Sequence, residues 1–334
     1  MGKGQRAKSK KPMKRSSATW WVLGVLAFLL IAGGSVAYFT RSDATAAPAE
    51  TAIGSFPHIH GLAVDPTRRE VLWIGAHGSL IRVAGVAGGK QWHRIGRQAY
   101  DMMGFNIHPA EPNVLLTSGH PGASDQRPNP LGVEISRDGG QTWQPLGLVG
   151  EADFHAMTIS RADPNVLYAW NVSGRMGLYR SRDGGRRWDY LGLKNLDQVF
   201  YLSTHPKQPA VVYAGTIHGL FISEDAGETW RPFSPALSRV PVTAIEVHPA
   251  NPQVMYAYAA KPDLGLVRSD DGGKQWTSLG LFLGDRDGVG NLALDPVDPQ
   301  VLYLATYSSD LYRSRDGGKS REQWASHGKV VVAQ

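Results

Sequence analysis

Short runs of apolar residues alternating with polar ones, separated by Pro- and Gly-rich turns, fill the chain from about residue 56 onward. Runs of about five residues with this alternation are typical of β-strands that bury one face. Residues 200–204, 211–215, 219–223 and 229–233 form one set of four such runs. Pro lies between the first and second runs, where a turn has no ladder hydrogen bond to lose. The pattern predicts an all-β chain built from repeated four-stranded units.

A Pro-containing turn followed by an apolar run recurs along the chain. The six copies occupy residues 65–73, 108–116, 163–168, 205–213, 248–256 and 295–303. Six copies between residues 56 and 324 give about 45 residues per unit, which is the repeat length of a four-stranded propeller blade. We therefore predict a six-bladed β-propeller.

A second motif, Ser-x-Asp-x-Gly-x-x-Trp, falls between the third and fourth strands of the predicted blades. Successive copies are 45, 42, 46 and 45 residues apart, and the last lacks Trp at the final position. Ser and Asp side chains bond backbone N–H groups of a turn, Gly allows positive φ, and Trp packs between blades. We interpret the motif as structural; its residues are Ser136, Asp138, Trp143, Ser181, Asp183, Trp188, Ser223, Asp225, Trp230, Ser269, Asp271, Trp276, Ser314 and Asp316.

This motif resembles the Asp-box, or BNR, repeat of bacterial sialidases, sortilin-type receptors and the photosystem II assembly propellers. The resemblance implies that the boxes lie in the hairpins between the third and fourth strands, on the rim opposite the functional face. Three units depart from it: Gly85 and Ala87 replace Ser and Asp, Ala226 replaces Gly, and Trp324 comes three residues late. Because the first and sixth blades meet in a closed ring, we expect the terminal segments to close it, with residues 329–333 as an added strand.

The amino-terminal region has a different pattern. Residues 1–18 carry seven Lys and Arg and no acidic residue, and residues 19–39 are uncharged and apolar. At about 1.5 Å per residue, such a helix crosses a hydrocarbon core of about 30 Å. We predict a basic cytoplasmic tail (1–18), a transmembrane signal anchor (19–39), a linker (40–55) and an extracytoplasmic propeller (56–334). A cleaved signal peptide is the alternative, but its apolar region is usually only about 7–15 residues long.

Charge and cysteine content narrow the function. The chain carries a formal charge of +6, but beyond residue 18 there are 28 basic and 29 acidic residues. The predicted propeller is therefore nearly neutral, which argues against nucleic-acid binding. The basic tail is expected to keep the amino terminus in the cytoplasm and to attract anionic lipid at the cell membrane. With no cysteine, the chain has neither disulfides nor thiolate metal ligands.

If the boxes mark one rim, the starts of the first strands and the turns after the second strands mark the other. That rim collects His58, His60 and His77 from blade 1 and a long loop, 119–130, from blade 2. Long loops over a channel mouth are usually binding loops. The candidate ligand-binding residues are His120, Arg127, Asn171 and Arg175.

The His58-x-His60 pair indicates a divalent metal as a candidate cofactor. On an extended segment both imidazoles share one face, and His155, Asp101 and Asp153 come from neighbouring blades. The alternative is that these groups hydrogen-bond along a wet channel. His108, His205 and His248 belong to the repeated Pro turn and are interpreted as structural. The segment 285–296 lacks the ligand spacing of a calcium loop.

Two main functions remain. The first is a membrane-anchored extracytoplasmic propeller that binds a small polar ligand, metal or partner segment at the channel mouth of blades 1–3. The second is a sialidase-like glycosyl hydrolase acting on surface or environmental glycans, with Asp101 and Asp153 as candidate catalytic carboxylates. Sialidase resemblance would require an Arg-Ile-Pro near the amino terminus, and the nearest string, residues 94–96, lies in a predicted outer strand.

Phrases outside the repeat, at 56–62, 101–105 and 151–155, resemble a bacterial membrane-anchored group that is labelled glycosyl hydrolase. That label rests on fold analogy. A receptor-like scaffold with a protein partner, resembling the sortilin or photosystem group, is a third interpretation.

Overall fold

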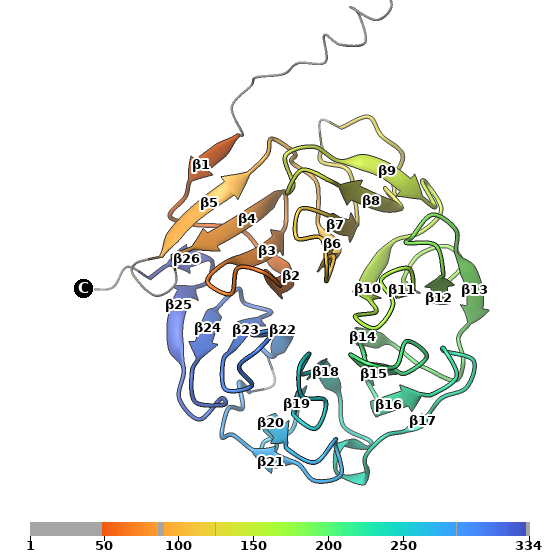
Figure 1. Ribbon diagram of the computed structural model, residues 1–334, viewed down its shortest axis with the longest axis vertical. Helices are drawn as coiled ribbons and strands as arrows, with labels where there is room; N and C mark the ends of the chain where they lie inside the picture. Colours follow the sequence, from red (N-terminus) through yellow and green to blue (C-terminus); the bar gives the residue numbers. More distant parts are fainter. Residues whose placement is uncertain (1–48, 86–89, 124, 285, 332–334) are drawn as a thin grey trace, which may run out of the picture. The chain divides into compact units, whose positions relative to one another are not determined.

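The structure, a computed structural model, describes residues 49–331 except 86–89, 124 and 285. In that part of the chain, six antiparallel sheets surround a common axis (Figure 1). Each blade uses one contiguous segment, and four consecutive strands of each run outward from the axis in chain order. This confirms the predicted all-β, six-bladed propeller.

The first three blades contain the strands that carry the candidate site. Blade 1 has β2 (Ile59–Val64), β3 (Leu72–Ala76), β4 (Ser79–Ala84) and β5 (Gln91–Ile95), with β1 (Glu50–Ala52) at its outer edge. Blade 2 has β6 (Met103–Ile107), β7 (Leu115–Ser118), β8 (Val133–Ser136) and β9 (Gln144–Gly147). Blade 3 has β10 (Phe154–Ile159), β11 (Leu167–Asn171), β12 (Gly177–Ser181) and β13 (Asp189–Gly192).

The other three blades follow the same plan. Blade 4 has β14 (Val199–Thr204), β15 (Val212–Thr216), β16 (Gly219–Ser223) and β17 (Arg231–Pro232), followed by the short 3-10 helix η1 (Pro235–Leu237). Blade 5 has β18 (Val242–Val247), β19 (Met255–Ala259), β20 (Gly265–Ser269) and β21 (Thr277–Ser278). Blade 6 has β22 (Val289–Leu294), β23 (Leu302–Thr306), β24 (Leu311–Ser314) and β25 (Glu322–Ser326), with β26 (Lys329–Val330) outside them.

The hydrophobic core lies between neighbouring blades. The second strands β3, β11, β15, β19 and β23 are buried along their whole length. Trp73 of blade 1, for example, packs with Phe105 and Leu115 of blade 2. A sheet covered on both faces needs apolar residues at successive positions, which explains the near-continuous apolar runs in these strands.

The Ser-x-Asp motifs form closed turns, as predicted. In the second, which belongs to blade 2, Ser136 Oγ donates to Asp138 Oδ1 (2.8 Å) and accepts from the Gly140 N–H (2.8 Å). Trp143 Nε1 then donates to the Gly140 carbonyl (3.2 Å). Gly140 has φ +86°, and a Cβ there would overlap Leu80 of the preceding blade. The turn therefore holds its hairpin and packs against the sheet of the preceding blade. The same Ser-to-Gly bond recurs at Ser181, Ser223, Ser269 and Ser314.

The sixth motif corrects one prediction. Arg321 stands where the other boxes have Trp, and its Nη1 donates to the Gly318 carbonyl (2.6 Å), the acceptor that the tryptophans use. Trp324 is not a displaced box residue, because it lies in β25, is fully buried and packs on Tyr303 with ring centroids 5.3 Å apart. The guanidinium thus supplies the hydrogen bond that the indole N–H supplies elsewhere.

Terminal segments close the ring, but as outer strands. Residues 50–52, which the sequence analysis placed in a linker, form β1 and pair with β5. β26 falls within the predicted added strand and pairs with β25. Its Lys329 bridges Ser55, and the Val330 N–H donates to the Gly54 carbonyl (2.9 Å). A salt bridge from Arg69 to Asp295 (2.8 Å) joins the inner turns of the same two blades.

The predicted tail, anchor and most of the linker, residues 1–48, lie outside the described residues. Within the described ranges, no helix is both long and apolar enough to cross a membrane.

Candidate functional site

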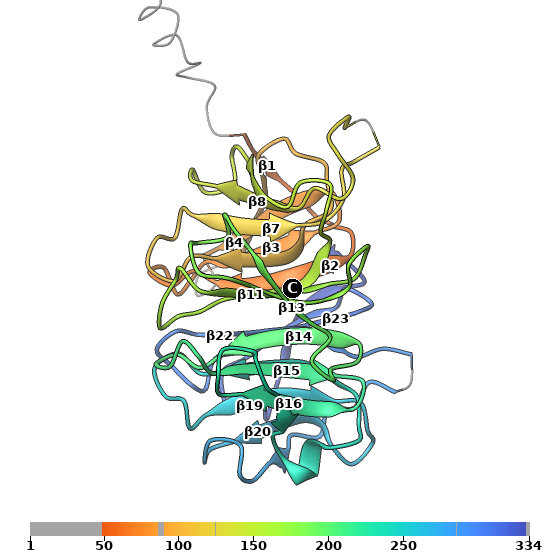
Figure 2. The ribbon, with the colours of Figure 1, turned by 90° about the vertical axis from the view of Figure 1, so that its right-hand side faces the viewer.

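The rim opposite the Asp boxes carries a concentration of His and Asp side chains in blades 1–3. The strands run from one rim of the ring to the other (Figure 2). First strands therefore begin, and second strands end, on the rim opposite the hairpins that hold the boxes. Among the described residues, two groups of two His and one Asp gather there, each with its ligand atoms within 4.8 Å of one another.

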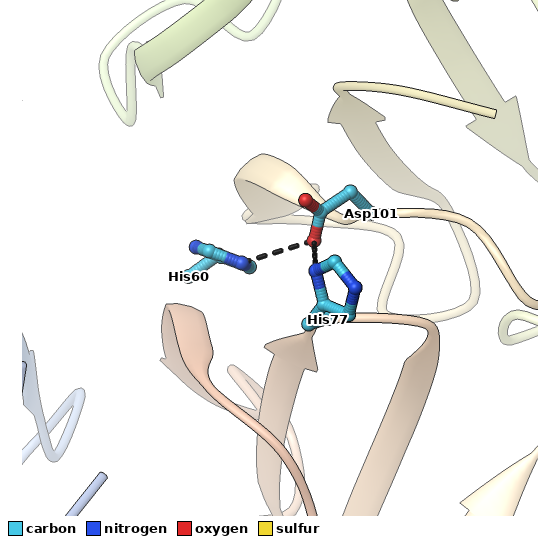
Figure 3. Close-up of side chains that lie close together, drawn as sticks. All are labelled: His60, His77 and Asp101. Atoms are coloured by element: carbon cyan, nitrogen blue, oxygen red, sulfur yellow. Dashed lines mark ion pairs between the residues drawn. The ribbon is translucent and has the colours of Figure 1, made fainter. Parts of the chain in front are cut away.

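The first group, the blade 1–2 cluster, consists of His60, His77 and Asp101. His60 lies in β2, His77 in the turn after β3, and Asp101 two residues before β6. Both imidazoles point at one carboxylate oxygen (Figure 3), with Asp101 Oδ1 2.9 Å from His60 Nε2 and 3.0 Å from His77 Nδ1. Three side chains from two blades thus converge on one point.

Burial and charge act in opposite directions on Asp101. Burial alone would raise the pKa of its carboxyl, but contacts and charges from His60 and His77 outweigh burial and hold the pKa below its usual value. Asp101 Oδ1 and His60 Nε2 are both closed to solvent, and although they are 2.9 Å apart they lack the alignment of a hydrogen bond. This is the arrangement expected of two atoms that coordinate the same metal ion, because metal ligands face one another without sharing a hydrogen bond.

The second group, the blade 2–3 cluster, consists of His120, Asp153 and His155. Asp153 Oδ2 is 3.1 Å from His120 Nε2 and 3.1 Å from His155 Nε2. The Asp153 side chain is only 4% exposed, while both histidines are about two-fifths exposed. Its second oxygen, Oδ1, is buried without a hydrogen-bond partner. An unpartnered buried carboxylate oxygen is costly, and a cation would satisfy it.

Two residues hold the blade 2–3 cluster in place. Asn171, at the end of β11, is fully buried; its Oδ1 accepts from the Asp153 N–H (2.7 Å), and its Nδ2 donates to the Ser173 and Arg175 carbonyls. Asn129 Oδ1 contacts His120 Nδ1 at 2.8 Å, which leaves His120 Nε2 facing Asp153. Asn171 was predicted to bind ligand, but its amide is engaged inside the chain and positions Asp153.

Of the three predicted metal ligands, the structure places two in the clusters. His60 and His155 each belong to one, whereas His58 stacks edge-on against His60 with centroids 4.9 Å apart and contacts Ser309 Oγ at 3.5 Å. Burial, followed by the charge of His60, lowers the pKa of His58. A bulge between Ile59 and Gly61 interrupts the strand at His60, so the contact between the two rings does not come from regular strand alternation.

The sequence analysis did not select His77 as a ligand. It had placed His77 on the correct rim, and its turn corresponds to the turn that carries His120 in the next blade. Comparing these two positions would have identified it.

The two predicted arginines serve the loops rather than the clusters. Arg127 pairs with Asp125 Oδ2 (2.6 Å) and Glu134 Oε2 (2.8 Å), and its guanidinium lies over the Tyr100 ring. Arg175 lies 3.8 Å from the centroid of the Tyr190 ring. Arg127 thereby fastens the long loop that carries His120.

Histidines in the Pro turns are structural, as predicted. His108 Nδ1 accepts from the Glu111 N–H (3.0 Å), His205 Nδ1 from the Lys207 N–H (3.2 Å) and His248 Nδ1 from the Asn251 N–H (3.0 Å).

A cavity of about 370 Å³ lies at the channel mouth next to the clusters, and His58, His60, Met103, His155 and Tyr307 are among its lining residues. Each cluster offers two imidazole nitrogens and one carboxylate oxygen. This set with open positions suits Zn²⁺ and other divalent transition ions. The clusters can therefore hold metal ions within reach of a molecule in the cavity.

The fold and the motif geometry define this chain as a six-bladed Asp-box β-propeller. Comparison with protein families agrees: the BNR/Asp-box repeat matches residues 134–145, and the sortilin family, described as "Sortilin, neurotensin receptor 3", matches residues 176–279. The two matches cover about a third of the chain, and both are to families that resemble it in the Asp-box repeat. No curated protein matches the sequence significantly.

Solved structures support the fold. A GH74 xyloglucanase from Xanthomonas campestris is 16% identical with a TM-score of 0.52, over 81% of this chain and 47% of that one. A GH74 enzyme from Niastella koreensis is 15% identical with a TM-score of 0.58, over 84% and 47%. YCF48 bound to D1 peptide is 16% identical with a TM-score of 0.50, over 84% and 85%. This chain spans about half the length of these GH74 enzymes, and the likeness establishes the fold alone.

Proposed function

We propose that this protein is a membrane-tethered, extracytoplasmic propeller that binds transition-metal ions at the channel mouth of blades 1–3. The observation that carries the proposal is the pair of His–Asp–His clusters on one rim, each with its ligand atoms within 4.8 Å of one another. Imidazole and carboxylate are suitable ligands for Zn²⁺, Ni²⁺ and Cu²⁺.

Hydrogen bonding along a wet channel explains the clusters less well. Asp101 Oδ1, His60 Nε2 and Asp153 Oδ1 are closed to solvent and lack aligned hydrogen bonds. Buried polar atoms are nearly always hydrogen-bonded, so three exceptions within two neighbouring clusters favour a missing ligand. One cation in each cluster would coordinate Asp101 and His60 in the first and the Asp153 carboxylate in the second.

Metal analysis of the full-length protein in detergent tests the proposal. After dialysis against an equimolar mixture of Mn²⁺, Co²⁺, Ni²⁺, Cu²⁺ and Zn²⁺, we expect up to two ions per chain by mass spectrometry. The double variant His60→Ala/His155→Ala should retain less than a fifth of that metal. His218→Ala is the matched control, because His218 is an exposed histidine that pairs with Asp197 outside both clusters. Absence of metal from the wild-type protein would refute the proposal.

The tether rests on the sequence of residues 1–39. We propose that the tail stays in the cytoplasm and that the propeller faces the opposite side, where ions and partners are taken from outside the cell. Alkaline extraction of membranes should leave the protein in the pellet, and protease added to spheroplasts should digest the propeller. Recovery in the soluble fraction at full length would argue against the tether.

Glycoside hydrolysis is the second candidate function. Asp101 and Asp153 are carboxylates from neighbouring blades at one channel mouth, and a xyloglucanase is among the proteins of similar fold. Each carboxylate is, however, engaged by two imidazoles. Turnover of chromogenic glycosides or xyloglucan by the wild type, lost in Asp101→Asn and kept in His218→Ala, would favour this function over metal binding alone.

A further inference from the structure

We propose that the two clusters are copies of one site that share Met103, and that the metal they take is copper. The inference deepens the proposed function and rests on it. It starts from the blade register, which assigns each cluster residue to a position in the repeat.

The His–Asp contact between neighbouring blades occurs twice in the same form. Leu72 pairs with Val83 in blade 1, and Leu115 pairs with Ser136 in blade 2, so Leu72 and Leu115 are equivalent starts of the second strand. Counting five residues onward gives His77 and His120. Each contacts an Asp that lies one or two residues before the inner strand of the next blade, Asp101 at 3.0 Å and Asp153 at 3.1 Å.

The remaining histidines, His60 and His155, also occupy equivalent positions in their blades. His60 lies in the first blade of its cluster, whereas His155 lies in the second blade of its cluster. In the inner strands, Ala63 pairs with Trp73 in blade 1, Asn106 with Leu116 in blade 2, and Thr158 with Tyr168 in blade 3. Three residues before each lie His60, Met103 and His155. The blade 1–2 cluster takes this position from its first blade, and the blade 2–3 cluster takes it from its second.

Met103 therefore occupies the fourth equivalent position of both clusters. It is half-buried and lines the cavity together with His60 and His155. A Cβ on Gly119, the residue before His120, would come within 3.3 Å of Met103 Cγ. The Met103 side chain thus passes the start of the loop that carries His120, and it occupies the repeat position that follows His60 by one blade.

A shared thioether selects the metal. Sulfur of Met is a soft ligand that favours Cu(I), while imidazole suits both copper states and carboxylate suits Cu(II). Two imidazoles, one carboxylate and one thioether can serve both oxidation states of copper, whereas Zn²⁺ gains little from the sulfur. One thioether sulfur coordinates one Cu(I) ion strongly. The first Cu(I) to bind therefore takes Met103, and the second binds only to the two imidazoles and the carboxylate of the other cluster.

Anaerobic titration of the full-length protein with Cu(I) against bathocuproine disulfonate tests this proposal. The wild type should bind two ions with affinities that differ at least tenfold. Met103→Leu should weaken the first step at least tenfold, leave the second within twofold, and leave Zn²⁺ binding within twofold. X-ray absorption of the singly loaded wild type should show a sulfur neighbour that Met103→Leu removes.

Met157→Leu is the matched control, since Met157 lines the same cavity but lies two residues beyond His155 and packs in the core. It should leave both Cu(I) steps unchanged. Equal losses in the two Met variants, or Cu(I) binding without a sulfur neighbour, would overturn the role of Met103 while leaving metal binding intact. Absence of any metal in wild type would instead remove the proposed function itself.

Discussion

The backbone N–H of Asp153 donates to Oδ1 of Asn171, 2.7 Å away, at the point where blade 3 joins the candidate site. Asn171 is fully buried, and its Nδ2 donates to the Ser173 and Arg175 carbonyls rather than to a side chain of the cluster. Its amide sets the direction in which the Asp153 carboxylate leaves the backbone. The site thus depends on a residue that binds no ligand itself.

Asn171→Ala should therefore weaken only one cluster. We expect the affinity of the blade 2–3 cluster for Zn²⁺ to fall about tenfold, because misplacing one ligand support costs 10–100-fold in affinity. Calorimetric titration in a His60→Ala background isolates that cluster. The blade 1–2 cluster, measured in a His155→Ala background, should change less than twofold. Equal losses at both clusters would mean that the variant disturbs the whole propeller.

The ion pair between Arg127 and the buried Glu134 should be essential to the loop 119–130. Glu134 is 1% exposed, and Arg127→Ala would leave its carboxylate unpaired, at a cost of about 3 kcal/mol in unfolding free energy. Urea unfolding followed by Trp fluorescence measures this loss. The double variant Arg127→Met/Glu134→Leu, which removes both charges, should recover most of it. A double variant as unstable as Arg127→Ala would show that the charge pairing is not the cause.

Two glycines with similar φ separate backbone strain from packing. Gly273, in the fifth box, has φ +86°, and a Cβ there would overlap the Phe233 ring; Gly280 has φ +69° with open space around it. Gly280→Ala should cost about 1 kcal/mol from the left-handed conformation alone. Gly273→Ala should cost about 2–4 kcal/mol, because the overlap with Phe233 adds to that strain. Equal losses in urea unfolding would contradict the packing role of the box glycine.

The Asp boxes should make stability depend on pH in the acid range. Hydrogen bonds from the Thr229 side chain and backbone lower the pKa of Asp225 to about 2. A lowered pKa means that the stabilisation is present above the unfolded-state value near 4 and is lost as pH falls through about 2. For this exposed carboxylate we expect about 1 kcal/mol after solvent screening.

Asp225→Asn checks the sign of this effect. The stability difference between the variant and the wild type in urea should be largest above pH 5 and should shrink towards pH 2. A difference that stays constant over this range would show that ionisation of Asp225 contributes nothing.

The blade count and the boxes were predictable because their signals are local. Each box is held by bonds between residues two to four apart, as between Ser136 and Gly140, so sequence spacing alone carries it. The pairing of His77 with Asp101 is different, because the two residues belong to different blades. Their distance depends on how the two sheets pack against each other. The bulge at His60 was also not predictable, because strand alternation in the sequence carries no signal for it. The role of Arg321 could not be predicted from the motif, because Arg and Trp have different side chains. What they have in common here is an N–H group that donates to the carbonyl of the box glycine.

The closing seam between blades 1 and 6 has a kinetic consequence. Every described blade is formed by one contiguous segment, so most pairings need only short loops to close, and such local pairings form quickly. At the seam, Arg69 must meet Asp295 and Lys90 must meet Glu322, contacts separated by 226 and 232 residues. During synthesis the first five blades can assemble before the last emerges, and the ring then waits for its final segment. Folding should thus be fast within blades and limited by closure of the circle.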